Sequence, residues 1–472
     1  MKNETGKESI DRINQLSVLV DILLSKNRLK SAEEVSRELV GIFYDQASYS
    51  KAEATATKAL AFLSSNLGAE HPETCWASKT LIDIYYRTGR FNDAEQLASQ
   101  TVAKLMGREG QHFTWADSIS NLVRILQQQG RLHDVEEWIT RLSELLEQYF
   151  DETDIIRLAH KCIIAYQRCL QGCWREAEGQ TLELIAQCRM RFGLECFAAA
   201  QAFGLLGEIY TSQGKWDEAN GFLDLAVTTA RKIYGRSHPN LLHILFNQVR
   251  LYVEQGRWDE AETADSECRE VAADLPLVGL MTISMYRAAI FEGRGNFDDA
   301  KELLEQVIQH LESEVCPQYL YLPEGKNILV GVLRSLSLLV ESEELGCQTV
   351  ELSNRIFGSH HPTSLRCVDN LARTWMAQGQ VSKAVQAMEE CVGSFESTIG
   401  PQHYLTQRSR TTLQEWREQV GFGGLIEQVD FGGLMEVDFG GLMEQVDFGG
   451  LMEQVDFGGL MEQEWSPTAA FP

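Results

Sequence analysis

Residues 214–219 read Gly-Lys-Trp-Asp-Glu-Ala, and residues 256–261 read Gly-Arg-Trp-Asp-Glu-Ala, 42 residues further along the chain. Both copies have a small residue, an apolar or aromatic residue two positions later, and alanine five positions after the small residue. Similar copies are Ala47-Tyr49-Ala52, Gly89-Phe91-Ala94, Gly130-Leu132-Val135, Gly172-Trp174-Ala177, Gly295-Phe297-Ala300 and Gly379-Val381-Ala384. The last two are separated by two repeat lengths, which predicts a degenerate copy at Ser337 with Leu339 in the aromatic position. The sequence therefore contains nine copies of one repeat.

A second pattern marks the other end of each repeat. Glycine recurs 21 residues after the small residue, as Gly68, Gly110, Gly193, Gly235, Gly358 and Gly400. Three residues later stand His71-Pro72, His238-Pro239, His361-Pro362 and, without proline, His403. Proline suits the first turn of a helix, where a missing N–H group costs nothing. Between these marks lie two helix-length stretches with apolar residues at i, i+3, i+4 and i+7, so each repeat is predicted to be a hairpin of helix A and helix B.

The hairpins predict the architecture and the limits of the domains. A single hairpin cannot bury both of its apolar faces, so the copies must stack on one another. We predict an all-α fold, an α-α superhelix (solenoid) of about nine hairpins over residues 28–420, which ends in a C-terminal capping helix. Residues 1–27 are expected to form an N-terminal capping helix. Residues 421–472 are expected to be a disordered tail, because glycine pairs interrupt it every eight or nine residues.

The turn pattern, the glycine 21 residues later and the His-Pro pairs, at a period of 42 residues, resemble the tetratricopeptide array of kinesin light chains and of proteins with kinesin-light-chain-like repeats. The resemblance covers roughly residues 30 to 420. It implies a fold in which helix A lines the concave wall, and a function in binding other proteins. Kinesin light chains carry a long heptad coiled coil before the repeats. Only about 27 residues precede the first hairpin here, so a motor subunit is not expected.

Composition restricts the classes of partner and the compartment. The 472-residue chain has a formal net charge of −26 and a pI of about 4.8, which argues against nucleic acid and anionic membrane surfaces as main partners. The N-terminus has no apolar signal segment, and no stretch approaches the roughly 20 apolar residues of a membrane span. Eleven cysteines are scattered without paired metal-site spacing, as expected of reduced structural thiols. We therefore expect a cytoplasmic protein.

No catalytic or cofactor motif occurs in the sequence, so the chain is predicted not to be an enzyme and to need no cofactor or metal. Phosphate-binding loops, nucleophile elbows and His-Glu-x-x-His zinc pairs are all missing. The recurring histidines are spaced by whole repeats and are interpreted as helix caps. Trp174, Trp216 and Trp258 could suggest a stacking platform, but each occupies the aromatic position of its repeat. Core packing is the favoured interpretation for all three.

The candidate binding residues are asparagines nine positions before the turn glycine, a place where kinesin-light-chain-like repeats often carry Asn. Each asparagine is followed three residues later by arginine, as Asn121 and Arg124, Asn247 and Arg250, and Asn370 and Arg373. Positions three apart share one helix face, so an amide and a guanidinium would act together. The amide could hold a peptide backbone while the guanidinium binds a carboxylate. The alternative is ordinary polar surface, with each Asn bonded to a neighbouring helix.

The sequence supports two hypotheses of function. The first is a non-catalytic adaptor or scaffold that binds acidic or aromatic-acidic peptide segments of partner proteins in its concave groove. The second is a regulatory subunit that docks on an enzyme or a basic partner through its acidic convex surface. The tail could itself occupy the groove, because Trp465 follows two glutamates at the end of an acidic linker. The alternative explanation of the tail is duplication of a short DNA unit without function.

Overall fold

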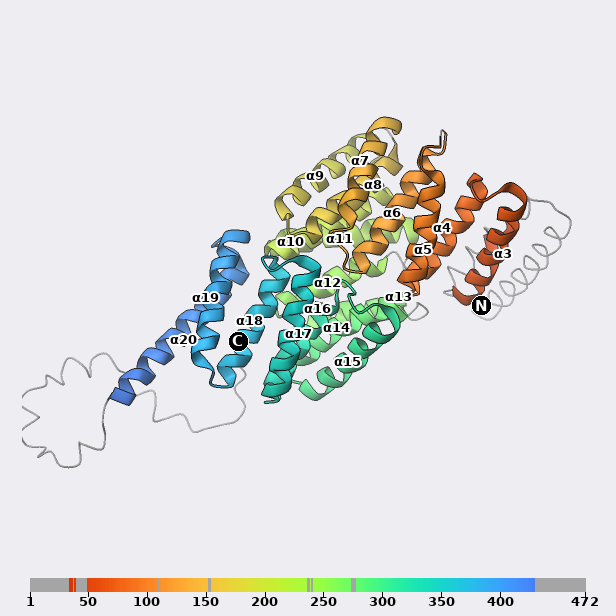
Figure 1. Ribbon diagram of the computed structural model, residues 1–472. Coiled ribbons are helices and arrows are strands. Elements are labelled where there is room, and N and C mark those ends of the chain that lie inside the picture. The colour runs from red at the N-terminus through yellow and green to blue at the C-terminus, as the bar shows by residue number, and fades with distance from the viewer. Residues whose placement is uncertain are drawn as a thin grey trace, which may run out of the picture. The chain divides into compact units, whose positions relative to one another are not determined.

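The computed structural model describes residues 34–36, 38–39, 49–108, 110–151, 154–235, 238, 241–272 and 277–428. These residues form helices joined by short turns, and they contain no strand (Figure 1). The A helices are α4 (Pro72–Arg87), α6 (His112–Gln128), α8 (Ile155–Leu170), α10 (Phe197–Gln213), α12 (Leu242–Glu254), α14 (Leu277–Gly293), α16 (Leu322–Ser335), α18 (Pro362–Ala377) and α20 (Tyr404–Gln428). The B helices are α3 (Tyr49–Leu67), α5 (Phe91–Leu105), α7 (Val135–Tyr149), α9 (Trp174–Arg191), α11 (Trp216–Tyr234), α13 (Trp258–Ala272), α15 (Phe297–His310), α17 (Leu339–Phe357) and α19 (Val381–Thr398). A π-helix, η2 (Leu311–Val315), directly follows α15.

Small residues join helix A to helix B in every hairpin whose turn is described. Their φ angles run from 61° to 79° at Gly89, Gly130, Gly172, Gly214, Gly256, Gly295, Ser337 and Gly379. This left-handed conformation suits glycine, which has no Cβ to meet the following carbonyl oxygen. The predicted degenerate copy at Ser337 is confirmed, because its serine has a φ of 61° between α16 and α17. Ala47, the turn of the first copy, lies outside the described residues.

The aromatic and alanine positions pack as the repeat predicts. Trp174, Trp216 and Trp258 are the first residues of their B helices. The alanine three positions further on is fully buried, at 0% exposure, in all seven described copies that carry it. Trp258 lies against Gly293 of the next hairpin, where a Cβ would come within 2.4 Å of its ring. This contact confirms core packing for Trp258.

Three of the recurring histidines cap helices. Nδ1 of His71, His361 and His403 accepts a hydrogen bond from the backbone N–H two residues later, at 3.3, 3.1 and 3.2 Å. Such a bond satisfies one of the N–H groups that the first helical turn leaves free. The capping interpretation is confirmed at these three positions. The residues next to His238 are not described.

Hairpins far apart in the sequence share one hydrophobic core. One cluster of buried residues joins helices α4 to α7 with helices α14 to α17, for example Leu132 with Ile356. A second cluster, from Leu158 to Ile290, fills the middle of the array. The A helices of successive repeats also contact each other, as α8 does α10 and α16 does α18. Sequence distance along the array is therefore no guide to spatial distance.

The ends of the array differ in how far the structure describes them. The chain divides into two units, Met1–Leu413 and Gln414–Pro472. Helix α20 runs to Gln428, beyond Val420, where we expected the array to end. The expected N-terminal capping helix and the tail from residue 429 lie outside the described residues. All eleven cysteines are free thiols, of which Cys173 and Cys347 are exposed.

Candidate functional site

A cavity of about 560 Å³ is lined mainly by A helices, with Tyr49, Phe91 and Tyr234 contributed by B helices. Aromatic side chains form much of its wall, together with polar groups from several repeats. Its lining includes Tyr86 and Arg87 of α4, Arg124 of α6, Cys162 and Tyr166 of α8, Glu208 of α10, and His243 and Phe246 of α12. Tyr319 and Tyr321, which precede α16, line it as well. The inner wall therefore combines aromatic surface with both signs of charge.

The first candidate pair, Asn121 and Arg124, lies on α6. The Arg124 guanidinium carbon stands 4.8 Å from the centre of the Tyr86 ring, a cation–π contact between neighbouring A helices. Nδ2 of Asn121 is buried and has no hydrogen-bond partner among the described residues. Burial alone would lower the pKa of the Arg124 guanidinium. The charge interactions with Tyr86, Asp83 and Asp117 raise this pKa instead. Arg124 is thus a cation within an aromatic wall.

The second pair, Asn247 and Arg250, joins α12 to α10. The amide of Asn247 donates to Glu208 at 3.3 Å, and the Arg250 guanidinium donates to Ser212 at 3.1 Å. Arg250 also pairs with Glu208 at 3.6 Å, where the Glu208 side chain is only 6% exposed. The pair thus holds a buried carboxylate that itself lines the cavity.

The third pair, Asn370 and Arg373, joins α18 to both neighbouring A helices. Asn370 donates to the Asn327 carbonyl oxygen at 2.7 Å and accepts from Arg334. Arg373 donates to Asp369 at 2.8 Å and to Thr412 at 3.0 Å. Neither residue lines the cavity. The third pair therefore lies apart from the first two.

The six candidate residues occupy A helices, and most of them bond to a neighbouring A helix. The side chains of Arg250 and Arg373 are 20% and 27% exposed, so they are half-buried instead of standing free on the wall. Arg124 lines the cavity directly, and Arg250 reaches it through Glu208. Any ligand that engages Arg250 or Arg373 must compete with a carboxylate already in place.

Sequence reasoning missed an ionic cluster that spans repeats far apart. Arg366 of α18 pairs with Glu254 of α12 at 2.9 Å and with Glu324 of α16 at 3.3 Å. Tyr404 donates to the same Glu254 at 3.2 Å. These groups are mostly buried, and Glu254 is separated from Arg366 by 112 residues. No local pattern indicates such a contact, because it depends on how far the stack winds.

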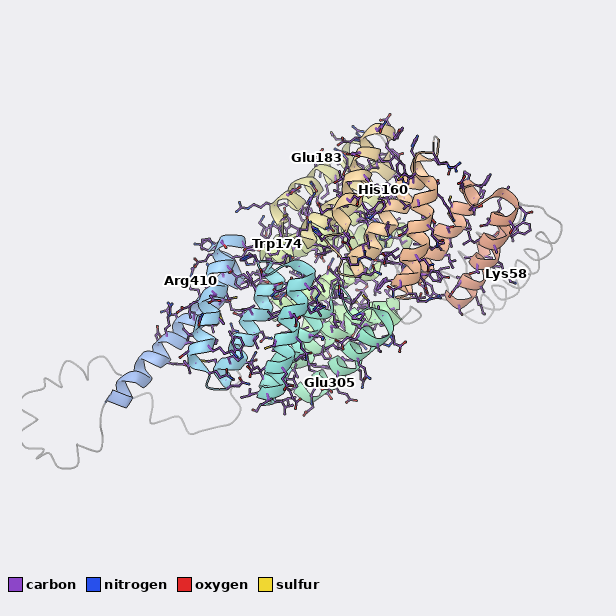
Figure 2. All side chains as sticks on the ribbon, in the orientation of Figure 1. Lys58, His160, Trp174, Glu183, Glu305 and Arg410 are labelled. Atoms are coloured by element: carbon purple, nitrogen blue, oxygen red, sulfur yellow. The ribbon has the colours of Figure 1, made fainter. Side chains whose placement is uncertain are left out.

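Two aromatic residues of the repeat also make contacts beyond their own hairpins. Trp174, labelled in Figure 2, stacks on His403 with 5.7 Å between ring centres, and Trp216 meets the edge of Tyr404 at 4.9 Å. Both tryptophans also pack against hydrophobic clusters of their own repeats. Both tryptophans therefore pack as predicted. Each also contacts an aromatic ring that follows it by at least 188 residues in the sequence.

The described residues contain no group of three or more side chains that could hold a metal ion. Within the same ranges, no helix combines the length and apolar character that crossing a bilayer would require.

Comparisons with known proteins identify the repeat. Residues 198–274 and residues 364–404 each match a sequence model of the tetratricopeptide repeat. No curated protein matches the chain.

Two solved structures match part of the chain at low sequence identity. One is a Podosopora anserina protein that is described as having kinesin light chain nearly identical TPR-like repeats. It is 20% identical to this chain, with a TM-score of 0.36, and the match covers 44% of this chain and 96% of that protein. BtubC (BKLC) from P. vanneervenii is 15% identical, with a TM-score of 0.35 over 49% of this chain and 90% of its own.

The matched segments cover most of α10 to α13 and of α18 to α19. The other described hairpins keep the same register, with a left-handed residue at each turn from helix A to helix B. Repeats of this kind form scaffolds for protein–protein interaction. The chain therefore contains tetratricopeptide repeats, which the family models match over residues 198–274 and 364–404.

Proposed function

We propose that this protein is a non-catalytic adaptor that binds peptide segments of partner proteins along the inner wall formed by its A helices. The observation that carries the proposal is the 560 Å³ cavity, in which Arg124 lies over Tyr86 among further aromatic side chains. An acidic or aromatic-acidic segment matches this wall, because guanidinium groups bind carboxylates and aromatic faces pack on one another. Arg250 and Arg373, with Asn121, Asn247 and Asn370, are proposed to extend the same recognition.

The test uses the full-length protein and arrays of acidic peptides. One probe is a fluorescent peptide of residues 458–472, which contains Trp465, and its control replaces Glu462 and Glu464 with glutamine. Arg124→Gln should weaken the binding of acidic peptides about tenfold, since it removes one charge-assisted contact.

The matched control for Arg124→Gln is Arg141→Gln. Arg141 lies 5.0 Å from the centre of the Trp138 ring on helix B, so it makes the same kind of contact away from the cavity. Arg141→Gln should leave binding unchanged. Equal binding by wild type and Arg124→Gln would contradict the groove hypothesis.

The second candidate, docking through the acidic convex surface, has its own structural support. B helices begin with acids, such as Asp217 and Glu218 in α11 and Asp298 and Asp299 in α15. Some acids of this face are already paired, because the basic residue after a turn reaches the preceding B helix. Examples are Arg131 with Glu95 and Lys215 with Glu178. Strong salt dependence of partner binding that Arg124→Gln does not alter would favour this second function.

Self-binding of the tail around Trp465 is proposed from the sequence alone. A tethered motif reaches a local concentration of about millimolar, which is enough for even a weak ligand to occupy a site part of the time. Deletion of residues 429–472 should then raise the affinity for the external acidic peptides. Equal affinity of the shortened and full-length proteins would leave the tail without a role in binding.

A further inference from the structure

Three turns of the array press against segments that follow them by about 190 residues. A Cβ on Gly130 would come within 2.4 Å of the Gln318 carbonyl oxygen, and one on Gly214 within 2.7 Å of the Tyr404 ring. A Cβ on Gly172 would lie 3.2 Å from the His361 ring. We call these three contacts the seam.

The seam is closed by specific bonds as well as by close packing. The backbone N–H of Leu320 donates to the Gln128 carbonyl oxygen at 2.9 Å. Nε2 of His403 lies 2.9 Å from the Ser212 carbonyl oxygen, which can only accept, so the imidazole donates there. The same ring uses Nδ1 to cap its own helix. One neutral histidine thus holds α20 to the end of α10.

The ionic cluster lies beside the seam and strengthens it. Arg366 bridges Glu254 and Glu324, and Tyr404 donates to Glu254, so α12, α16, α18 and the start of α20 are joined at one place. Charges that are mostly removed from water attract one another more strongly than exposed pairs do. Parting α12 from α18 would leave these charges without their partners.

The seam has a consequence for access to the inner wall. The cavity lies beside the seam, because its lining includes Gln128, whose carbonyl oxygen accepts from Leu320 there. Its volume of about 560 Å³ is within the range of about 300–1,000 Å³ typical of sites for small molecules. An extended peptide that follows several repeats needs a longer, open groove. Loop residues Tyr319 and Tyr321 also occupy the inner wall, where Tyr319 stacks on Phe91 at 6.0 Å and Tyr321 contacts Tyr166 at 3.2 Å.

We infer that the seam is a latch that keeps the inner wall closed. A partner peptide can then bind the inner wall only when the contacts at Gly130, Gly172 and Gly214 break. This inference rests on the proposed function for its ligand. The opening itself is a property of the protein alone. It can therefore be measured without any partner.

Cys162 provides the measurement, because it lines the cavity and is 9% exposed. Its labelling by N-ethylmaleimide in the full-length protein, followed by mass spectrometry, reports access to the inner wall. Exposed Cys347, away from the cavity, serves as the reference thiol in the same sample. Labelling of Cys162 relative to Cys347 should be slow in the wild-type protein.

Two variants open the seam, and each has a matched control. His403→Asn keeps a side-chain acceptor for the cap but loses the bond to Ser212, and its control is His71→Asn, a cap outside the seam. Gly214→Ala adds a Cβ against Tyr404. Its control Gly379→Ala has a similar φ, 78° against 72°, and nothing within 4 Å of the added carbon.

His403→Asn loses one hydrogen bond of the seam, which should raise the population of the open state about fivefold. The rate of Cys162 labelling should rise by the same factor in His403→Asn and should not change in His71→Asn. The rate of Cys162 labelling should likewise be higher in Gly214→Ala than in Gly379→Ala. If Gly214→Ala fails to fold, His403→Asn still decides the matter. Equal Cys162 labelling in His403→Asn and His71→Asn would overturn the latch. Failure of the peptides to bind would contradict the proposed function and leave this result untouched.

Discussion

Ser337 lies at the turn position between helix A and helix B that glycine occupies in the other described repeats. Its φ is 61°, and it is the only residue other than glycine with a positive φ among those described. The left-handed conformation costs an L-residue roughly 1–2 kcal/mol, because Cβ approaches the following carbonyl oxygen. The side chain of Ser337 is exposed, so little packing offsets this cost.

Ser337→Gly should therefore stabilise the protein. The relief of about 1–2 kcal/mol is reduced by the greater freedom of glycine in the unfolded chain, worth about 0.5–1 kcal/mol. A net gain of about 0.5–1 kcal/mol remains. The reverse change at the next turn, Gly379→Ser, is the matched control. Its φ is 78° and an added Cβ would meet nothing within 4 Å, so only the backbone term acts. It should lose a similar amount.

Urea unfolding followed by helical circular dichroism measures both changes. Repeat arrays do not always unfold in one step, so hydrogen exchange of the amides in α16 and α17 should accompany it. Exchange in these helices should slow in Ser337→Gly, and exchange in α18 and α19 should quicken in Gly379→Ser. If Ser337→Gly were destabilising while Gly379→Ser behaved as expected, the serine hydroxyl would have to make a stabilising contact. If neither variant changed stability, the backbone argument would be wrong.

Two further predictions concern pH. Burial raises the pKa of Glu292 to about 7, although nearby Arg334 acts to lower it. The folded state therefore disfavours the charged carboxylate. Stability that is present below pH 4.5 is lost as the pH rises through 7. Glu292→Gln should gain up to about 3 kcal/mol at pH 8 and nothing at pH 4, as measured by urea unfolding. Burial lowers the pKa of His361 to about 4, although the nearby Leu170 backbone acts to raise it. The contribution of His361 to stability is therefore present above pH 6.5 and is lost as the pH falls through 4. His361→Asn, which can still cap the helix, should unfold less readily than the wild type at pH 4 relative to pH 7, and an unchanged acid sensitivity would contradict this assignment.

The 42-residue period predicted the hairpins because each turn is a local event. A left-handed residue and an N-terminal cap depend on neighbours within a few positions, and the sequence displays these as Gly214 or His361. The seam could not be predicted in this way. Small rotations between neighbouring hairpins add up over five repeats, and only their sum brings Gly172 against His361. The π-helix at Leu311–Val315 also has no signal in the repeat pattern.

The bonding partners of the candidate residues did leave a signal, which lies in the spacing of polar residues between neighbouring A helices. Asn247 and Glu208 are 39 positions apart, and Arg250 and Ser212 are 38 apart. Arg373 and Thr412 are again 39 apart. The partners of Asn370 lie 43 and 36 positions before it, so polar residues roughly 36 to 43 positions from a candidate are its predicted partners. The pattern of Asn and Arg within one helix, taken alone, concealed these bonds.

The contacts of the three arginines also rank their roles in binding. Arg250 shares Glu208 with Asn247, and Arg373 is held by Asp369, so a ligand carboxylate must replace a protein carboxylate at either place. Removal of these arginines would leave buried acids uncompensated, which commonly costs several kcal/mol of stability.

Arg124 differs, because its guanidinium packs on the face of Tyr86, and Asp83 and Asp117 act on it by charge without an ion pair among the described contacts. A cation–π contact leaves N–H groups at the edge of the guanidinium free to meet a carboxylate in the same plane. A ligand can therefore add a charge-assisted bond at Arg124 without breaking one. By this reasoning, Arg124→Gln should weaken binding more than Arg250→Gln or Arg373→Gln does, and it should cost less stability, because buried Asp83 keeps Arg87 and Lys79 as partners.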